Sequence, residues 1–227
     1  MTLEITTLTT PFIFNATVNC YLVKTGDNFI LIDTGMTNKR DVIEKELENA
    51  GCQPGNLTLI VLTHGDFDHS GNAAYLRKKF GTPVAMHKSD SGMVERGDML
   101  WNRNKQNILI RIMFKLFFRL SEPDRFKPDF YIDEGYNFLD HGFDAKVLAI
   151  PGHSKGSIGI LAKSGDLFCG DLLVNTDKPA KNTIIDDVDK LNASVEKLNH
   201  FQINTVYPGH GQSFSMELFM KNLASTT

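Results

Sequence analysis

The sequence has few of the features that mark membrane-spanning, disulfide-bonded or polyanion-binding proteins. It contains only three cysteines, Cys20, Cys52 and Cys169, and no Cys-x-x-Cys pair. This odd number argues against a disulfide framework, so we interpret them as buried free thiols. No apolar run reaches the roughly 18 residues that a transmembrane helix needs. The net charge is only −3 and no Lys/Arg block occurs, so we expect no nucleic-acid partner.

The remaining composition is typical of an ordinary globular enzyme. Of the 227 residues, 41% are hydrophobic and 22% are charged, which suits one domain over residues 1–227 with a layered core. The first residues, Met1-Thr2-Leu3-Glu4, contain no basic and apolar leader, so we expect a cytoplasmic protein. A small-molecule substrate fits this composition better than a long polyanion.

Hydrophobic patterns predict strands that alternate with helices along most of the chain. Helical spacing predicts helices around Val42, Ile43 and Leu47, over 73–80, and around Val188, Leu191, Val195 and Leu198. Apolar and β-branched runs predict strands at 18–24, 29–33, 57–62, 83–87, 145–150, 157–163, 166–169 and 205–207. This order indicates a layered fold that contains both helices and sheets.

A dense cluster of polar side chains follows the predicted strand at 57–62. Within six consecutive residues the chain places His64, Asp66, Asp68 and His69. A strand that ends in a tight loop directs alternate side chains to one side, so the first three can converge while His69 takes a neighbouring position. Two partly buried carboxylates this close repel each other unless a cation lies between them. The cluster therefore predicts a metal site.

Other loops also place a His or an Asp directly after a predicted strand. They are Pro151-Gly152-His153, Gly170-Asp171 and Pro208-Gly209-His210, and Asp33-Thr34-Gly35 follows the strand at 29–33. Loops at one edge of a layered sheet are where binding sites are usually built. His87, His141 and His200 match none of these motifs, so we interpret them as surface or hydrogen-bonded core histidines.

The five motifs, in this order between residues 33 and 210, resemble the metallo-β-lactamase superfamily, which includes the glyoxalase II-like metallo-hydrolases. The resemblance implies a mixed α/β (α+β) fold, the four-layer αβ/βα sandwich, with a dinuclear metal site at one edge. It implies that His64, Asp66 and His153 hold one ion, and that Asp68, His69 and His210 hold the second. Asp171 would bridge the two ions, and Asp33 would orient the cluster loop.

One position departs from the pattern of the superfamily. The usual second ligand is a His, whereas this chain has Asp66. A carboxylate is a harder, negatively charged ligand, and it shifts preference from zinc toward iron or manganese. A comparable carboxylate occurs in the flavodiiron branch, so a diiron oxidoreductase or an oxygen-sensing protein is an alternative. The chain has no room for the flavin domain of that branch, and redox work would need an external electron donor.

Hydrolysis is the reaction that this resemblance favours. Two close divalent ions supply a bridging hydroxide near neutral pH and stabilise the oxyanion that forms on attack. We expect cleavage of a small ester, thioester or lactone, with Asp68 orienting the water and accepting its proton. A nuclease or phosphodiesterase of the same fold is a further alternative. Asp171 occupies the place where several β-lactamases have a Cys ligand, which disfavours β-lactam hydrolysis.

Residues 88–131 match no motif and are predicted to form an insertion over the site. Their segment 108–120 reads as a helix that is apolar except for Arg111, Lys115 and Arg119. Such a helix exposes more apolar surface than one domain face can cover. At about 20 Å it is too short to span a bilayer, which leaves a structural helix pinned under neighbouring loops, a lid, a homodimer interface or a membrane-surface contact. Candidate substrate contacts are Lys155, Phe114, Phe117 and Phe118.

Overall fold

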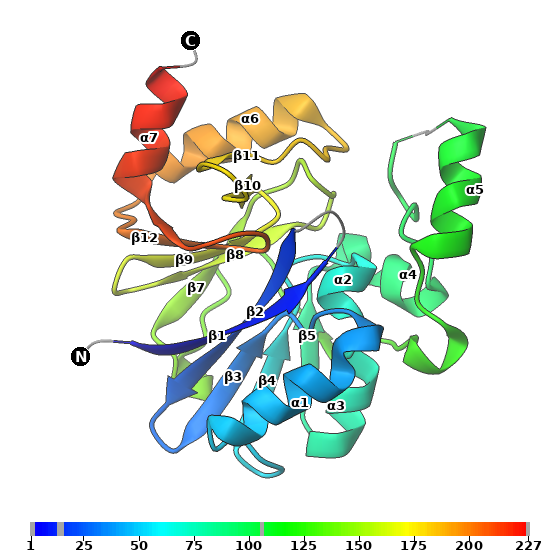
Figure 1. Ribbon diagram of the computed structural model, residues 1–227. Coiled ribbons are helices and arrows are strands. Elements are labelled where there is room, and N and C mark those ends of the chain that lie inside the picture. The colour runs from blue at the N-terminus through cyan, green and yellow to red at the C-terminus, as the bar shows by residue number, and fades with distance from the viewer. Residues whose placement is uncertain (1–2, 13–15, 105–106, 226–227) are drawn as a thin grey trace.

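The computed structural model describes residues 3–12, 16–104 and 107–225, and its strands form two main sheets (Figure 1). The first sheet has the strand order β1(Glu4–Pro11), β2(Thr17–Thr25), β3(Asn28–Ile32), β4(Leu57–Val61), β5(Val84–Met86), β6(Phe130–Tyr131). The second has the order β13(Phe214–Ser215), β12(Thr205–Pro208), β9(Asp166–Gly170), β8(Ile158–Ala162), β7(Ala145–Ala149). A short pair, β10(Leu173–Val174) and β11(Ala180–Lys181), stands apart.

Three apolar layers hold the two sheets and their helices together. The middle layer lies between the sheets and includes Ile30, Val61 and Ile160. One outer layer joins the first sheet to the helices α1(Arg40–Asn49), α3(Ala73–Phe80) and α4(Lys88–Arg96). The other outer layer joins the second sheet to α6(Val188–Lys197) and α7(Met216–Ala224). This arrangement is the predicted four-layer αβ/βα sandwich, which is confirmed (Figure 1).

Alternation along the inner strands explains why each strand faces two layers. In β3, Ile30 and Ile32 belong to the middle layer, whereas Phe29 and Leu31 belong to the outer one. Side chains on a strand point to opposite faces in turn, so a strand with apolar residues at every position is buried on both sides. The near-continuous apolar run at 57–62 likewise predicts a buried strand, and β4 (Leu57–Val61) confirms it.

Local signals place the ends of several elements as the sequence predicts. The hairpin between β2 and β3 turns at Gly26, where φ is +69°. The helix α3 covers Ala73–Phe80 as expected and ends at Gly81 with φ +68°, a left-handed conformation that glycine adopts without a steric penalty. The sequence analysis did not predict β1, β13, α4, α7 or the short helix α2(Phe67–Ser70).

The topology brings the motif loops to one edge of the sandwich. Strands β3 and β4 run parallel in the first sheet, and β9 and β12 run parallel in the second. The carboxyl ends of parallel neighbours meet at the same edge of a sheet, so the loops that follow these strands gather there. These loops carry the motif residues, which are Asp33, the 64–69 cluster, Asp171 and His210.

The predicted insertion contains the helices α4 and α5(Ile108–Phe117), and it ends in the edge strand β6 of the first sheet. Phe130–Tyr131 form β6 and pair with β5, so these two residues extend the first sheet. The predicted helix at 108–120 is too long, because Phe118 has φ −122° and ψ 70° and Leu120 turns into the core. Residues 105–106 and the side chains of Ile110 and Lys115 lie outside the described part of the chain.

The helix α5 stands apart from both sheets (Figure 1). Among the described residues, no helix has the length and apolar character needed to cross a membrane.

Candidate metal centre

Side chains that are far apart in the sequence converge at the edge between the two sheets. Potential ligand atoms within 4.8 Å of one another form three overlapping groups. These groups are His64, Asp66 and His153; Asp68, His69 and His210; and His64, His69 and Asp171. Each of the seven residues that the sequence proposes as metal ligands therefore lies in this one site.

In the first group, Asp66 lies between two imidazoles. Its Oδ2 is 2.8 Å from His153 Nε2 and 3.6 Å from His64 Nε2. Asp66 has β-region dihedrals directly before α2, so its side chain points back toward the strand ends. One ligand atom from each residue can face a common point here, as a metal position requires.

In the second group, His69 and His210 face two carboxylates. Asp68 Oδ2 lies 3.7 Å from His69 Nε2 and 3.6 Å from His210 Nε2. Asp171 Oδ1 is 3.3 Å from His69 Nε2, and its Oδ2 is 3.2 Å from His210 Nε2 and 3.8 Å from His153 Nε2. Asp171 is thus the residue that reaches histidines of both groups, which suits a bridging carboxylate.

All four imidazoles are held through Nδ1, which leaves each Nε2 directed toward the centre. His153 Nδ1 donates to the Ile184 carbonyl and His210 Nδ1 to the Thr17 carbonyl, both at 2.7 Å. His69 Nδ1 donates to Asp33 Oδ2 at 2.9 Å. His64 Nδ1 lies 3.0 Å from the Thr63 hydroxyl oxygen. Such anchors fix the tautomer and orientation of metal-binding histidines in general.

Asp33 connects the first sheet to the cluster loop. Its carboxylate accepts hydrogen bonds from the Thr63 backbone N–H at 2.8 Å, the Thr63 hydroxyl at 2.7 Å and His69 Nδ1. Because the Thr63 hydroxyl donates to Asp33, its oxygen accepts the proton of His64 Nδ1. Asp33 has φ +60°, an uncommon backbone conformation for a residue other than glycine. The three hydrogen bonds and the buried position hold this strained residue in place.

The donor set fits divalent cations. Four buried polar atoms that face the centre have no hydrogen-bond partner, namely His64 Nε2, His69 Nε2, Asp66 Oδ1 and Asp171 Oδ1. Unpaired buried polar atoms carry a desolvation cost of about 1–3 kcal/mol each, and a coordinated cation removes that cost. Imidazole nitrogens and carboxylate oxygens are ligands that zinc, iron and manganese share.

The electrostatics of the metal-free site show the same demand for positive charge. Burial raises the pKa of Asp171, but His210 and His69 outweigh burial and hold this pKa well below its usual value. Burial lowers the pKa of His210, but the Asp171 carboxylate outweighs burial and raises this pKa to about 9. The pKa of His69 is also raised, against its own burial, chiefly by Asp171 and Asp68. Without metal, the carboxylates therefore favour the protonated forms of His69 and His210.

Glycine is required where the His210 loop passes the centre. A Cβ on Gly209 would overlap Asp171 Oδ1 and the imidazole of His69. The Pro-Gly-His motif thus lets the backbone approach the ligands closely while it presents His210.

Sequence reasoning missed two residues of the insertion that contact this site. Asp90 of α4 is buried and accepts hydrogen bonds from Gly65 N at 3.2 Å, Gly156 N at 2.8 Å and the Ser154 hydroxyl at 2.5 Å. It thereby ties the cluster loop to the loop of His153. Arg103 donates from Nη2 to Asp66 Oδ2 at 2.7 Å. No motif marks either residue, because the contacts depend on how the insertion folds back.

The predicted substrate contacts lie at different distances from the centre. Lys155 Nζ donates to Asn102 Oδ1 at 3.2 Å, so this lysine anchors the insertion. Phe118 packs on Phe67, with ring centroids 5.4 Å apart, and Phe114 packs on Phe118. Phe117 is 73% exposed and points away from the body of the protein. Phe67 lies between Asp66 and Asp68 in the sequence, so Phe118 contacts the cluster loop through Phe67.

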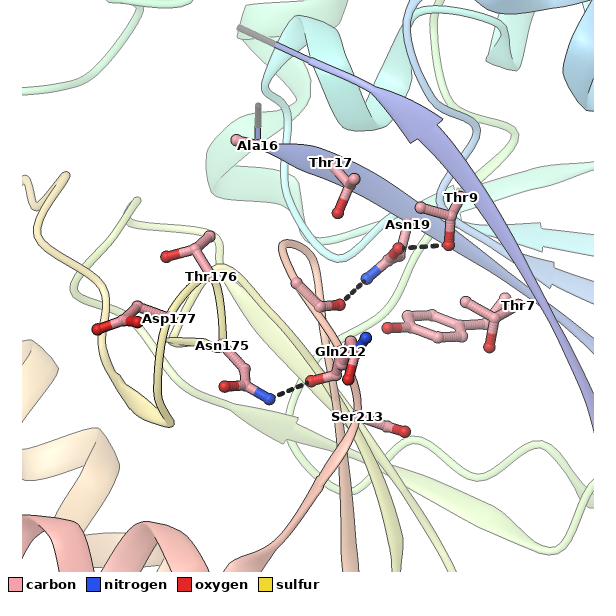
Figure 2. A pocket seen from close by; sticks show the side chains of 12 residues that line it. Thr7, Thr9, Ala16, Thr17, Asn19, Asn175, Thr176, Asp177, Gln212 and Ser213 are labelled. Carbon is pink, nitrogen blue, oxygen red and sulfur yellow. Dashed lines mark hydrogen bonds between the residues drawn. The ribbon is translucent and has the colours of Figure 1, made fainter. Parts of the chain in front are cut away.

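A polar cavity of about 770 Å³ lies beside the His210 loop (Figure 2). Its lining includes Thr17, Asn19 and Gly211, but none of the seven candidate ligands. Asn19 donates from Nδ2 to the carbonyls of Gly211 at 2.6 Å and Pro208 at 3.1 Å. The cavity wall therefore helps to position the loop that carries His210.

Comparison with known proteins identifies relatives over nearly the whole chain. The profile of the metallo-beta-lactamase superfamily matches residues 15–210. A protein of Methanocaldococcus jannaschii named probable metallo-hydrolase MJ0888 is 26% identical over 198 residues, covering 86% of this chain and 87% of the relative. The hydroxyacylglutathione hydrolase GloC of Haemophilus influenzae is 28% identical over 164 residues, covering 68% and 66%. The crystal structure of TTHA1623 in a di-iron-bound form has a TM-score of 0.69 and 27% identity, covering 90% and 92%.

The raised pKa of His210 predicts that metal affinity depends on pH. Below about pH 9 the metal-free imidazole carries a proton that must leave before Nε2 can bind a cation. We therefore expect the apparent affinity for Mn²⁺ to rise from pH 6.5 to pH 9. We also expect protons to be released on binding. Competition with a chelator of known protonation behaviour measures the affinity, and titration calorimetry in two buffers measures the protons. An affinity that stays constant over this range would contradict the prediction.

Proposed function

Because the chain belongs to the metallo-β-lactamase superfamily, we propose that it is a dinuclear metal-dependent hydrolase that cleaves a small ester, thioester or lactone. The observation that carries this proposal is the convergence of two His–Asp groups that share Asp171 at one edge of the sandwich. A metallo-hydrolase relative over 86% of the chain supports the reaction class.

The geometry suggests which residues hold each ion. We assign His64, Asp66 and His153 to the first position, and Asp68, His69 and His210 to the second. Asp171 would join the two positions, since its two oxygens face histidines of both groups. Asp33 is a positioning residue that holds His69 directly and His64 through Thr63.

When bound, two divalent ions lower the pKa of a shared water toward about 7 and stabilise the oxyanion that forms during attack. The protein must position the acyl group and accept the proton that the attacking water releases. Asp68 is suited to the second task. It is the second residue of α2, is almost fully buried, and keeps its Oδ2 more than 3.5 Å from both neighbouring histidine Nε2 atoms. A carboxylate that is not tied by short hydrogen bonds can turn toward the water and take its proton.

Asp66 bears most directly on which metal the site prefers. An aspartate in the first group adds a negative charge and a hard oxygen ligand, which favours iron or manganese beside zinc. A relative whose structure holds two iron ions supports iron as a candidate. The same observations favour a second function, a diiron oxidoreductase or oxygen-sensing protein, which would need an external electron donor.

The substrate class rests on the relatives and on the composition. GloC is named for hydrolysing hydroxyacylglutathione, which supports the thioester among the three candidate substrates. We also propose that the insertion covers the first metal position, because Arg103 and Asp90 reach the cluster loop from it. The three cysteines are free and buried, which suits a reducing compartment such as the cytoplasm.

A hydrolase panel on protein of known metal content tests the proposed reaction. We expect turnover of thioesters, esters or lactones, because the site supplies two metal positions and a proton acceptor. Activity should vanish on dialysis against a chelator and return with Mn²⁺, Fe²⁺ or Zn²⁺. Phosphodiesters and β-lactams serve as comparison substrates.

Two results would contradict the hydrolase. One is turnover on the panel that is unchanged after the metal has been removed. The other is a visible iron spectrum that bleaches on reduction in a protein inactive on every substrate of the panel, which would support the redox function instead.

Substitution Asp68→Asn tests the proton acceptor. The amide keeps the size of the side chain but cannot take up the proton, so we expect kcat to fall by about 10²–10⁴-fold with little change in KM. Metal content, measured by mass spectrometry, should be compared in the same preparations because Asp68 is also a proposed ligand. Asp140→Asn, at an exposed carboxylate in the turn after Phe138, is the matched control. A fully metallated Asp68→Asn protein with normal kcat would refute this role.

A further inference from the structure

Arg103 brings a permanent positive charge to the first metal position. Its Nη2 donates to Asp66 Oδ2 at 2.7 Å and lies 3.4 Å from His153 Nε2. The Arg103 side chain is only 7% exposed, so it is enclosed with these two partners. Arg103 belongs to the insertion, far in sequence from every other residue of the centre.

The guanidinium engages an oxygen that a cation would use. His153 Nδ1 donates to the Ile184 carbonyl, and its Nε2 donates to Asp66 Oδ2 at 2.8 Å. Arg103 Nη2 donates to this same oxygen and lies 3.4 Å from His153 Nε2, so it stands beside both atoms. A metal ion in that position needs these same two ligand atoms.

Negative charge surrounds the guanidinium. Three carboxylates, Asp66, Asp68 and Asp171, belong to the centre, and Arg103 contacts the first of them directly. Asp90 and Asp186 also interact with the Arg103 charge and help to hold it beside the first position. The ligands Asp68, His69, His210 and Asp171 stay clear of Arg103, since the described contacts of its guanidinium are to Asp66 and His153.

The segment that carries Arg103 is attached on both sides. Asn104 donates from its backbone N and from Nδ2 to Asp186, both at 2.6 Å. On the other side, Asn102 accepts from Lys155 at 3.2 Å. These contacts fix the backbone over the site, while the long side chain of Arg103 can still change rotamer.

We propose that Arg103 is an internal cation that occupies the first metal position while one divalent ion fills the second, so that a further ion binds only by displacing it. The inference rests on the metal assignment of the proposed function. The two metal positions would then differ in affinity, and the insertion would set the affinity of the weaker one.

Metal titration of the full chain tests the proposal, with Mn²⁺ as the probe. Metal-free wild-type protein should bind two equivalents, the second at least about tenfold more weakly than the first. Arg103→Gln should raise the Mn²⁺ affinity of the weaker equivalent by about tenfold and change the affinity of the stronger one by less than about twofold. Arg103→Lys keeps the charge and should stay near wild type. Titration calorimetry gives the affinities, and mass spectrometry after dialysis gives the stoichiometry.

A second variant acts without changing the centre. Asn104→Ala removes the hydrogen bond from Nδ2 to the Asp186 carbonyl and keeps the one from the backbone N–H; the residue is exposed, so the protein should fold normally. An Arg103 that is held less firmly competes less well with Mn²⁺ for the first position. The Mn²⁺ affinity of the weaker equivalent should therefore rise again. The inference would be overturned if the two Mn²⁺ equivalents bound with equal affinity in wild type and in every variant. Loss of the weaker equivalent in Arg103→Gln would overturn it too. Either result would leave the proposed hydrolase function intact. Failure of every protein to bind Mn²⁺, Fe²⁺ or Zn²⁺ would overturn both proposals.

An independent observation concerns the outer face of α5. Its residues Ile108, Leu109, Ile112, Met113, Leu116 and Phe117 are between 42% and 73% exposed. The opposite side of the helix is the attached one, where Phe114 and Phe118 pack toward Phe67. An exposed apolar face of this kind marks an interaction surface.

Charge identifies the partner that fits this face. From Arg103 to Ser121 the sequence contains five cations and no Asp or Glu. Arg111 and Arg119, both exposed, flank the apolar face. Two copies paired through α5 would place like charges side by side, whereas an anionic surface would attract them. The helix has ten residues and is about 15 Å long, which suits a position in the plane of a membrane surface.

We infer that α5 docks on an anionic lipid surface with its apolar face inserted at the headgroup boundary. Cosedimentation with vesicles tests this inference. The full chain should bind vesicles of phosphatidylcholine and phosphatidylglycerol in equal parts, and should bind pure phosphatidylcholine at least about tenfold more weakly. Leu109→Ser with Phe117→Ser should abolish binding. Leu139→Ser, at an apolar residue exposed elsewhere, is the matched control.

Two outcomes would overturn this inference. One is equal binding of both vesicle types, or of neither. The other is a dimer in light scattering that Leu109→Ser with Phe117→Ser dissociates, which would assign the face to a second copy of the chain.

Discussion

The need to balance concentrated negative charge governs the architecture at the edge of this sandwich. Asp66, Asp68 and Asp171 lie within a few ångströms of four imidazoles, and four of the polar atoms that face inward have no protein partner. Positive charge comes from two sources, the raised pKa values of His69 and His210 and the guanidinium of Arg103. Both lie directly beside the carboxylates that they balance.

That arrangement depends on joining the two sheets through a few fixed contacts. Asp33, at the end of β3, holds the cluster loop through Thr63 and His69. From the second sheet, Gly209 allows the backbone to pass close to Asp171. Asn19 and Tyr21 of β2 donate to the Pro208 carbonyl and fix the same loop from the first sheet. The two halves therefore meet through hydrogen bonds that also orient the ligands.

Much of this could be predicted from the sequence, because the signals are local. The strand at 57–62 and the end of α3 before Gly81 follow from periodicity and from backbone freedom, with β4 ending one residue earlier, at Val61. The motif residues after the strands converge as parallel topology requires. The insertion could not be predicted in the same way. Its helix is three residues shorter than the apolar pattern predicts, because Phe118 and Leu120 leave the helix to contact Phe67 and the core. Arg103 and Asp90 carry no motif, and only long-range folding brings them to the cluster.

Asp66 and Arg103 are best understood together. A neutral histidine at position 66 would bring no charge, and the buried guanidinium beside it would lose its hydrogen-bonded counter-ion, which is costly in a buried site. With Asp66, the same guanidinium has a carboxylate partner at 2.7 Å. In the proposed two-metal centre, this carboxylate would therefore do more than add a hard ligand. It would couple the first metal position to the insertion that carries Arg103.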